Sequence, residues 1–369
     1  MGGTATLLRG RVPRADACTA TQQREPCHPR RLTQYKEGRV FGNAADAAKL
    51  ESRTVNSGGR QLGDELQGDP YFRAKSTAMI VDEAIRFIKA NKDKPFYVNA
   101  WTLLPHAPLK PTPEQLKVYE GLAPSAGDPA FGEWMQKYLG EAKDLKSQMQ
   151  IFCASLTNLD EEIGRLLKAL DDLGLAENTV VVYSSDNGTE DYHVGNAANA
   201  GVGSTGPLRA RKRSLYEGGV RTPLLVRWPG RVPAGRVDEE SVIAAVDFLP
   251  TVCRLAGVTV DAGKIKPDGE DVSDLLFGKP RPRRTPILWE WLFEVAGERA
   301  YFAPRLAIRE GPWKLLINPD RSRIELYDIP NTTTPLTSLR GGSPDPPRRS
   351  PRFRPCGAGS RGGSGDPPR

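Results

Sequence analysis

Hydrophobic residues recur at helical spacing along two long segments of the chain. In residues 72–91 the apolar positions include Ile80, Ala84 and Ile88, and a Lys-Asp-Lys-Pro sequence follows. Proline cannot continue the helical hydrogen-bond ladder, so the helix is expected to stop there. Residues 145–173 carry a longer apolar stripe that ends before a glycine, which is a common helix terminator. The pattern therefore predicts helices over 72–91 and 145–173.

Three shorter runs are apolar and rich in β-branched or aromatic residues, at 96–101, 179–183 and 222–227. Continuous runs of this kind are typical of strands that are covered on both faces. Another helix is expected over 247–256, with a proline in its first turn and a glycine after its end. Strands that alternate with helices predict an α/β fold, with a mostly parallel sheet and flanking helices.

A smaller unit follows the α/β segment. Short apolar runs at 306–309, 313–317 and 324–327 are separated by turn residues, a Gly-Pro pair and an Asn-Pro-Asp triplet. Turn residues at such close spacing favour antiparallel strands. We therefore expect a small antiparallel sheet near the C-terminal end of the folded part.

Composition and pattern divide the chain into four segments. Residues 1–68 show no sustained period and are expected to be weakly ordered. Residues 69–280 form the predicted main domain, and residues 281–330 form the predicted small subdomain. Residues 331–369 are rich in Pro, Gly, Arg and Ser, have little to bury and are expected to be disordered.

The positive charge of the chain is concentrated in the last segment. The whole sequence has a net charge of +7, and residues 331–369 hold seven arginines against two aspartates. The rest of the chain is therefore close to neutral, which argues against a nucleic-acid partner for the folded part.

Cysteine content and hydropathy exclude some other classes of protein. The five cysteines include no Cys-x-x-Cys pair, so neither a disulfide framework nor a thiolate zinc site is expected. Cys153 and Cys253 lie among helical apolar residues and are expected to pack in the core. No apolar stretch approaches the roughly 20 residues of a membrane span, and arginines interrupt residues 1–20, so no membrane partner and no signal peptide are expected.

Polar residues follow two of the predicted strands, where ligands gather in open α/β sheets. Asp186 and Asn187 come directly after the strand at 179–183, and their side-chain oxygens suit Ca²⁺ or Mg²⁺ better than zinc. An ordinary turn is the alternative, because Asp, Asn and Gly are common turn formers. His106 follows the strand at 96–101 between two prolines that restrict its backbone, although it could also be an exposed loop residue. His193 is a weaker candidate.

A loop at residues 206–219 is unusually basic. Arg209, Arg211, Lys212 and Arg213 precede Glu-Gly-Gly. The functional interpretation is an anion clamp, in which lysine supplies a point charge and the glycines permit close backbone approach. The alternative is a solvated basic loop.

These segments together resemble the sulfatase family, in the N-acetylgalactosamine-6-sulfatase-like or arylsulfatase branch. The resemblance extends over roughly residues 69–330. It is carried by Asp-Glu-Ala-Ile at 82–85, Pro-His-Ala-Pro at 105–108, Leu-Asp at 159–160, Ser-Ser-Asp-Asn-Gly at 184–188, Arg-Lys-Arg-Ser-Leu-Tyr-Glu-Gly-Gly-Val-Arg-Thr-Pro at 211–223, Trp-Pro-Gly at 228–230, Asp-Phe-Leu-Pro-Thr at 247–251, Trp-Lys-Leu at 313–315 and Glu-Leu-Tyr-Asp at 325–328.

The resemblance implies an alkaline-phosphatase-like fold and hydrolysis of aryl or carbohydrate sulfate esters with one Ca²⁺ ion. By the same resemblance, Asp186 and Asn187 are two metal ligands, and Lys212 and His106 contact the sulfate. A metal and fixed cations would stabilise the negative charge that builds on the sulfuryl and leaving oxygens. Members of the family are usually periplasmic or extracellular.

The sequence also departs from the family pattern. The family uses paired aspartates after its first strand, a Cys-x-Pro-Ser-Arg cysteine that becomes formylglycine, and a Gly-Lys-Trp-x-His segment. Asp171 and Asp172 form a pair, but it lies in a predicted helix, and no Gly-Lys-Trp occurs. Cys27 begins a Cys-His-Pro-Arg-Arg sequence that lacks the family's serine. Without the aldehyde nucleophile the first step of the reaction is lost, so the site is expected to be incomplete and activity is in doubt.

Several interpretations remain open at this point. The first is a sulfatase by descent and fold, and the second is a non-catalytic remnant that binds sulfated glycans through Lys212. A phosphatase or phosphodiesterase of the same superfamily is a third, although three histidines are few for its two-metal site. The sequence after residue 330 looks like a shifted reading frame, and the hypothesis extends to residues 1–68. One intact frame across both junctions on resequencing would exclude this hypothesis.

Overall fold

The computed structural model describes residues 3–9, 68–142, 144–194, 197–259, 266–292, 297–329 and 337–338. The predictions made for residues 10–67, including the Cys27 sequence, and for most of 331–369 lie outside these residues. Both Cys153 and Cys253 are free thiols within helices; Cys253 is buried, as expected of a core residue, whereas Cys153 is only half-buried.

The main sheet has four strands in the order β2-β1-β3-β4. Their bounds are β1 Gly3–Arg9, β2 Phe96–Trp101, β3 Val180–Ser185 and β4 Leu224–Arg227. Leu7 of β1 pairs with Val98 of β2 on one side and with Val181 of β3 on the other. The three strands predicted from apolar runs are thus present, and β1 was not predicted.

The strand directions correct the expectation of a mostly parallel sheet. β2 and β3 run in the same direction, as a strand–helix–strand crossover requires, but they are not neighbours. β1 lies between them and runs opposite to both, and β4 runs opposite to β3. Every strand pair in the described part of this sheet is therefore antiparallel.

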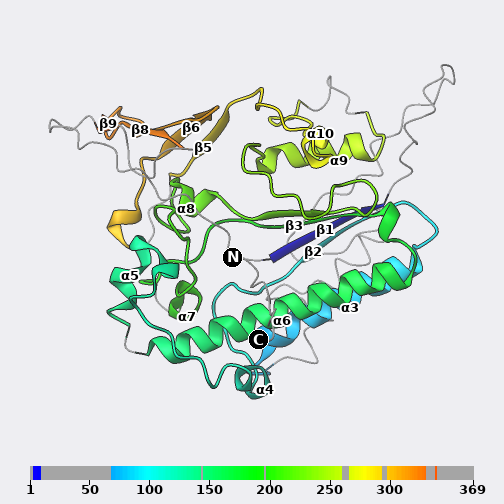
Figure 1. Cartoon of the computed structure of the whole chain (residues 1–369), viewed down its shortest axis with the longest axis horizontal. Helices are drawn as coiled ribbons and strands as arrows, with labels where there is room; N and C mark the ends of the chain where they lie inside the picture. Colours follow the sequence, from blue (N-terminus) through cyan, green and yellow to red (C-terminus); the bar gives the residue numbers. More distant parts are fainter. Residues whose placement is uncertain are drawn as a thin grey trace, which may run out of the picture.

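Helices cover both faces of the main sheet (Figure 1). Two long helices, α3 (Phe72–Ala90) and α6 (Leu145–Asp172), pack against one face, and both match the predicted ranges closely. Two shorter helices, α9 (Phe248–Leu255) and α10 (Ser273–Leu276), lie on the other face. The first layer buries a cluster that includes Ile88, Val98, Leu166 and Leu170, all at most 1% exposed. The second buries Val180 against Trp228 and Leu255.

Strand β4 differs from its prediction in one respect. It was expected to be covered on both faces, but Leu224 is 42% exposed and Leu225 is 57% exposed. β4 is the edge strand of the described sheet, so its apolar run does not indicate full burial.

The small sheet has five antiparallel strands in sequence order. Their bounds are β5 Ile287–Glu290, β6 Leu306–Glu310, β7 Trp313–Ile317, β8 Glu325–Asp328 and β9 Thr337–Ser338. The antiparallel prediction is confirmed for β6, β7 and β8. β5 and β9 were not predicted, and Gly311, with φ +54°, makes the turn between β6 and β7.

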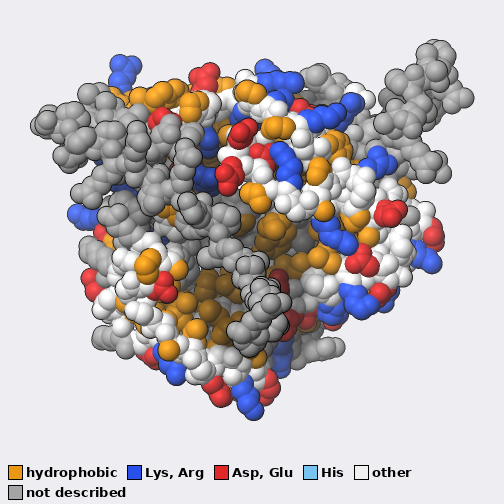
Figure 2. Space-filling model, viewed as in Figure 1, with side chains coloured by type: hydrophobic (Ala, Val, Ile, Leu, Met, Phe, Trp, Pro, Cys, Tyr) orange, Lys and Arg blue, Asp and Glu red, His pale blue; other side chains and the backbone are white. Residues whose placement is uncertain are grey.

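The remaining elements are short. The helices are α4 Pro113–Lys117, α5 Glu133–Leu139, α7 Ala198–Gly201 and α8 Glu217–Val220, and the 3-10 turns are Pro129–Phe131, Ala176–Asn178, Ala245–Asp247 and Arg299–Tyr301. None of the described helices has the length and apolar character needed to cross a bilayer. Acidic and basic side chains are interspersed among the coloured residues of the face shown in Figure 2.

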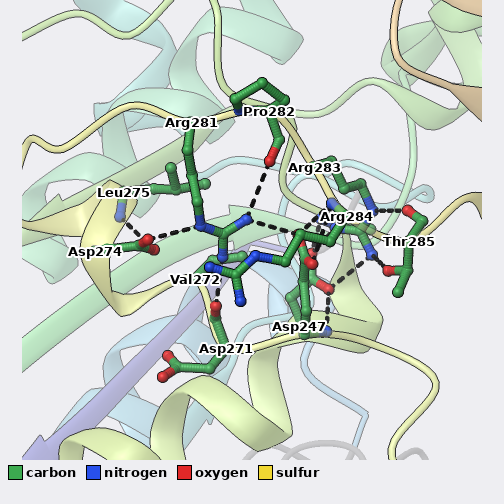
Figure 3. A network of polar contacts seen from close by, with 12 residues as sticks. Asp247, Asp271, Val272, Asp274, Leu275, Arg281, Pro282, Arg283, Arg284 and Thr285 are labelled. Carbon is green, nitrogen blue, oxygen red and sulfur yellow. Dashed lines mark hydrogen bonds and ion pairs between the residues drawn. The ribbon is translucent and has the colours of Figure 1, made fainter.

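A buried ion pair fixes the segment that leads into the small sheet (Figure 3). The side chains of Arg283 and Asp247 are 4% and 0% exposed, and Nη2 of Arg283 donates to Oδ1 of Asp247 at 2.8 Å. The same carboxylate accepts from the backbone N–H groups of Ala244 and Glu270, at 2.8 and 2.9 Å. The start of α9 is thereby tied to the chain just before β5.

Candidate functional site

Two loops form the centre of the candidate site. Loop A, residues 186–191, follows β3, and loop B, residues 209–219, includes the first residues of the short helix α8. The backbone N–H of Gly188 donates to the carbonyl oxygen of Gly219 at 2.8 Å, and that of Lys212 donates to Thr189 at 2.8 Å. Two of the motifs that carried the family resemblance, at 184–188 and 211–223, are therefore hydrogen-bonded neighbours.

Glycines allow the loops to approach this closely. A β-carbon on Gly188 would lie 1.8 Å from the carbonyl oxygen of Gly218. Within loop B, a β-carbon on Gly218 would lie 2.0 Å from the oxygen of Ala210, and one on Gly219 would lie 2.1 Å from that of Ser214. The sequence predicted that the glycine pair lets the backbone approach an anion. In the structure the pair lets chain segments approach one another.

Arg211 has a structural role in holding the loops. Its side chain is buried; Nε donates to the carbonyl oxygen of Glu190 at 2.6 Å, and Nη2 donates to that of Gly201 at 2.5 Å and to Oγ1 of Thr189 at 3.3 Å. Burial lowers the pKa of Arg211 to about 10, which leaves it charged at pH 7. It therefore joins loop A, and Gly201 beyond it, to loop B from the inside.

The carboxylate of Glu190 pairs with Lys212 and Arg213, the two basic residues that follow Arg211. Its side chain is 4% exposed, and it accepts from Nη1 of Arg213 and, at 3.3 Å, from Nη2. Burial acts to raise the pKa of Glu190, but the Arg213 hydrogen bond, a backbone N–H and the Lys212 charge outweigh it, and the pKa lies below its ordinary value. Sequence analysis missed Glu190, because no local pattern distinguishes it from an exposed acid.

Lys212 has the looser contact with this carboxylate. Its Nζ lies 3.6 Å from Oε2 of Glu190, beyond hydrogen-bond length, and its side chain is 15% exposed. Arg209 contacts the small sheet, and Arg211 and Arg213 contact Glu190. All three arginines of loop B therefore bind protein groups. The structure thus separates the basic run into structural arginines and one lysine that is held less tightly.

His106 shares the electrostatic environment of Lys212. Its Nδ1 donates to the carbonyl oxygen of Ala107 at 2.7 Å, which leaves Nε2 as the second ring nitrogen. Half-burial lowers the pKa of His106; the Ala107 bond acts against this, and the positive charges of Lys212 and Arg73 add to the lowering. The ring is therefore neutral at pH 7.

Asp186 and Asn187 lie at the end of β3, as predicted. Asp186 is exposed, whereas Oδ1 of Asn187 is buried and has no hydrogen-bond partner. An orphaned carbonyl oxygen beside a carboxylate is a donor set that suits Ca²⁺. Within the described ranges, no group of three His, Cys, Asp or Glu residues could hold a metal, so these residues supply two oxygens and not a full shell.

His193 lies apart from these groups. Its ring packs edge-on against Tyr138 with a centroid distance of 4.7 Å, and its nitrogens lie 3.8 and 3.9 Å from Asp191 and Glu141. No described contact links it to Lys212 or His106.

Comparison with known proteins identifies the family. The profile of the family called Sulfatase matches residues 27–258, which is more than half of the chain. This chain belongs to the sulfatase family. A second profile, N-sulphoglucosamine sulphohydrolase, C-terminal, matches residues 210–342 and so spans loop B and the small sheet.

Curated sulfatases are similar over part of their length. Mouse steryl-sulfatase is 32% identical over 215 residues, which cover 58% of this chain and 30% of the relative. Human arylsulfatase A is 35% identical over 153 residues (42% and 28%), and human N-acetylgalactosamine-6-sulfatase is 32% identical over 187 residues (50% and 30%). The chain thus spans about 30% of the length of these relatives.

Solved structures support the fold. Ps i-CgsB in complex with k-i-k-neocarrahexaose superposes with a TM-score of 0.52 at 24% identity, covering 71% of this chain and 50% of that one. A protein solved in complex with its substrate D-glucosamine-2-N,6-O-disulfate gives a TM-score of 0.51 at 21% identity, with 69% and 63% covered. At this identity the likeness establishes a shared sulfatase fold.

Proposed function

We propose that the protein is a sulfuric ester hydrolase by descent whose described residues form the anion-binding part of a site for aryl or carbohydrate sulfates. The observation that carries this proposal is the hydrogen-bonded contact of loops A and B. It joins the strand end with the orphaned oxygen of Asn187 to the loop that holds Lys212. The family membership and the disulfated sugar named as the substrate of one protein of the same fold support the substrate class.

In this proposal Lys212 supplies a positive charge to the sulfate oxygens. Its pairing with Glu190 at 3.6 Å orients the ammonium group without fully occupying it. Arg211 and Arg213 hold the backbone on either side, so the charge stays fixed while an anion binds. His106 contacts the same anion through Nε2.

Asp186 and Asn187 are the residues that would hold a Ca²⁺ ion. The ion, when bound, would neutralise charge on the sulfuryl oxygens. The exposed carboxylate of Asp186 and the buried amide oxygen of Asn187 would give it one charged and one neutral ligand.

A second candidate function is binding of sulfated glycans without turnover. It is favoured by the sequence itself, in which no Cys-x-Pro-Ser-Arg occurs and Cys27 lacks the serine of that pattern. The two functions share the anion site and differ in the nucleophile.

An assay of the full chain with an aryl sulfate and an aryl phosphate, each with and without Ca²⁺, distinguishes these functions. Sulfate turnover that is lost in Lys212→Ala and in Cys27→Ala supports the hydrolase, and mass spectrometry of the Cys27 peptide reports whether an aldehyde has formed. Sulfate binding without turnover supports the second candidate. Turnover of the phosphate in preference to the sulfate contradicts both.

A further inference from the structure

The small sheet contacts loop B on both sides of Lys212. Before Lys212, Nη1 of Arg209 donates to the hydroxyl of Tyr327 at 2.7 Å and lies 3.5 Å from Oε2 of Glu325. After Lys212, the hydroxyl of Tyr216 lies 2.8 and 3.0 Å from the two carboxylate oxygens of Glu325. Glu325, the first residue of β8, is 8% exposed and thus joins both ends of the loop.

In a second buried ion pair the charges are reversed, because the cation lies on the small sheet and the acid lies on loop B. Nζ of Lys314, on β7, donates to Oε1 of Glu217 at 2.7 Å and lies 4.7 Å from the centre of the Trp289 ring. The Lys314 side chain is 1% exposed, and burial lowers its pKa while Glu217 acts to raise it. Glu217 of loop B therefore pairs with a cation of the small sheet, and Glu325 of the small sheet pairs with a cation of loop B.

Apolar packing follows the same path. Leu215 and Tyr216 of loop B share one buried cluster with Ala307, Leu316 and Tyr327 of the small sheet. The guanidinium of Arg209 also lies over the Tyr216 ring, 3.9 Å from its centre. The residues on each side of Lys212 are thus fixed to the sheet and to each other, while Lys212 itself contacts loop A, through its backbone N–H to Thr189 and its ammonium group near Glu190.

We propose that the small C-terminal sheet positions Lys212 by clamping loop B at both ends, with Glu325 and Lys314 as the positioning residues. The clamp rests on the proposed role of Lys212 in binding sulfate. Its physical basis is that both buried charges have partners across the contact, Glu325 in Arg209 and Tyr216 and Lys314 in Glu217, although Arg323 also pairs with Glu325 and Arg309 lies near Glu217. Removal of Glu325 or Lys314 therefore breaks the polar contacts that cross from the small sheet to loop B, and is expected to loosen the loop rather than only the surface.

Hydrogen exchange of the full chain tests the clamp directly. Glu325→Gln and Lys314→Met each remove one charge, and Tyr216→Phe removes the hydroxyl contacts without leaving a buried charge unpaired. We expect exchange in residues 209–219 to accelerate by about tenfold or more in each variant, while peptides of α3 and α6 keep wild-type rates. Glu290→Gln is the matched control, because Glu290 is an exposed acid on β5 of the same sheet and no exchange change is expected.

Titration with inorganic sulfate tests the consequence for Lys212. Glu325→Gln should weaken sulfate binding about tenfold or more, and Glu325→Asp, which keeps the charge, should restore most of it. Unchanged exchange in residues 209–219, or equal acceleration in α3 and α6, overturns the clamp. Local acceleration with unchanged sulfate affinity overturns the positioning of Lys212.

The two proposals fail in different ways. A wild-type chain that binds no sulfate refutes the proposed function, but the exchange measurement still decides whether the small sheet clamps loop B. A chain that binds sulfate equally well in all variants refutes the positioning of Lys212 by the small sheet and leaves the proposed function standing.

Discussion

Gly188→Ala tests whether the contact between loops A and B fixes the anion site. A β-carbon at position 188 would lie 1.8 Å from the carbonyl oxygen of Gly218 and 3.0 Å from Cα of Gly219. Non-bonded carbon and oxygen atoms approach to about 3.3 Å, so one loop must move by about 1.5 Å. Backbone atoms oppose the new methyl group on that side, and no flexible side chain can give way.

The cost of this movement follows from its parts. Overpacking costs about 1–3 kcal/mol, and loss of the hydrogen bond from Gly188 to Gly219 adds about 1 kcal/mol. We therefore expect the free energy of unfolding to fall by about 2–4 kcal/mol. Displacement of Asn187 from Lys212 by more than about 1 Å should also weaken sulfate binding on the order of 100-fold.

Calorimetric titration with sulfate and thermal unfolding followed by circular dichroism measure the two effects. Gly164→Ala in α6 is the matched control, since a β-carbon there meets nothing within 4 Å. Alanine should stabilise that helix by up to about 1 kcal/mol and leave sulfate binding unchanged. If Gly188→Ala binds sulfate like the wild type and unfolds at the same temperature as Gly164→Ala, the steric argument for the loop contact is wrong.

Three further predictions concern charge. First, the pKa of His106 lies below its ordinary 6.5 because half-burial disfavours the charged ring, whereas an anion at Nε2 favours it. Sulfate affinity should therefore rise as the pH falls below 7, and His106→Gln should flatten this profile in titrations. The stability that the neutral ring contributes is lost as the pH falls through the lowered pKa. Second, Ca²⁺ should raise the unfolding temperature of the wild type but not of Asp186→Ala, and an equal rise in both would place the ion elsewhere. Third, Arg283→Met leaves buried Asp247 unpaired and should cost about 3–5 kcal/mol in urea unfolding, whereas Arg227→Met, at a half-exposed pair, should cost less than about 1 kcal/mol.

Local sequence patterns predicted the long elements well. The helices α3 and α6 and the strands β2 and β3 were predicted within one or two residues, because periodicity and a following proline or glycine define their ends. Strand direction was not predictable in the same way. β1 has no distinctive local pattern, yet its place between β2 and β3 replaces a parallel β2–β3 pair with two antiparallel pairs.

The candidate site could be predicted only in part. Asp186, Asn187, His106 and Lys212 were proposed from motifs, and the structure places the first two and Lys212 on contacting loops. The groups that hold them could not be found, because their partners are distant in sequence. Glu325 lies 109 residues from Tyr216, and no local pattern marks the pair.

The contact between loop B and the small sheet also bears on where the chain can be divided. A boundary at residue 280 follows the change in sequence pattern, but the buried cluster of Leu215, Tyr216, Leu316 and Tyr327 crosses it. A fragment that ends at residue 280 would leave Tyr216 and Arg209 without their partners and expose that apolar cluster to water. The two parts of the chain are therefore expected to be stable only when expressed as one piece.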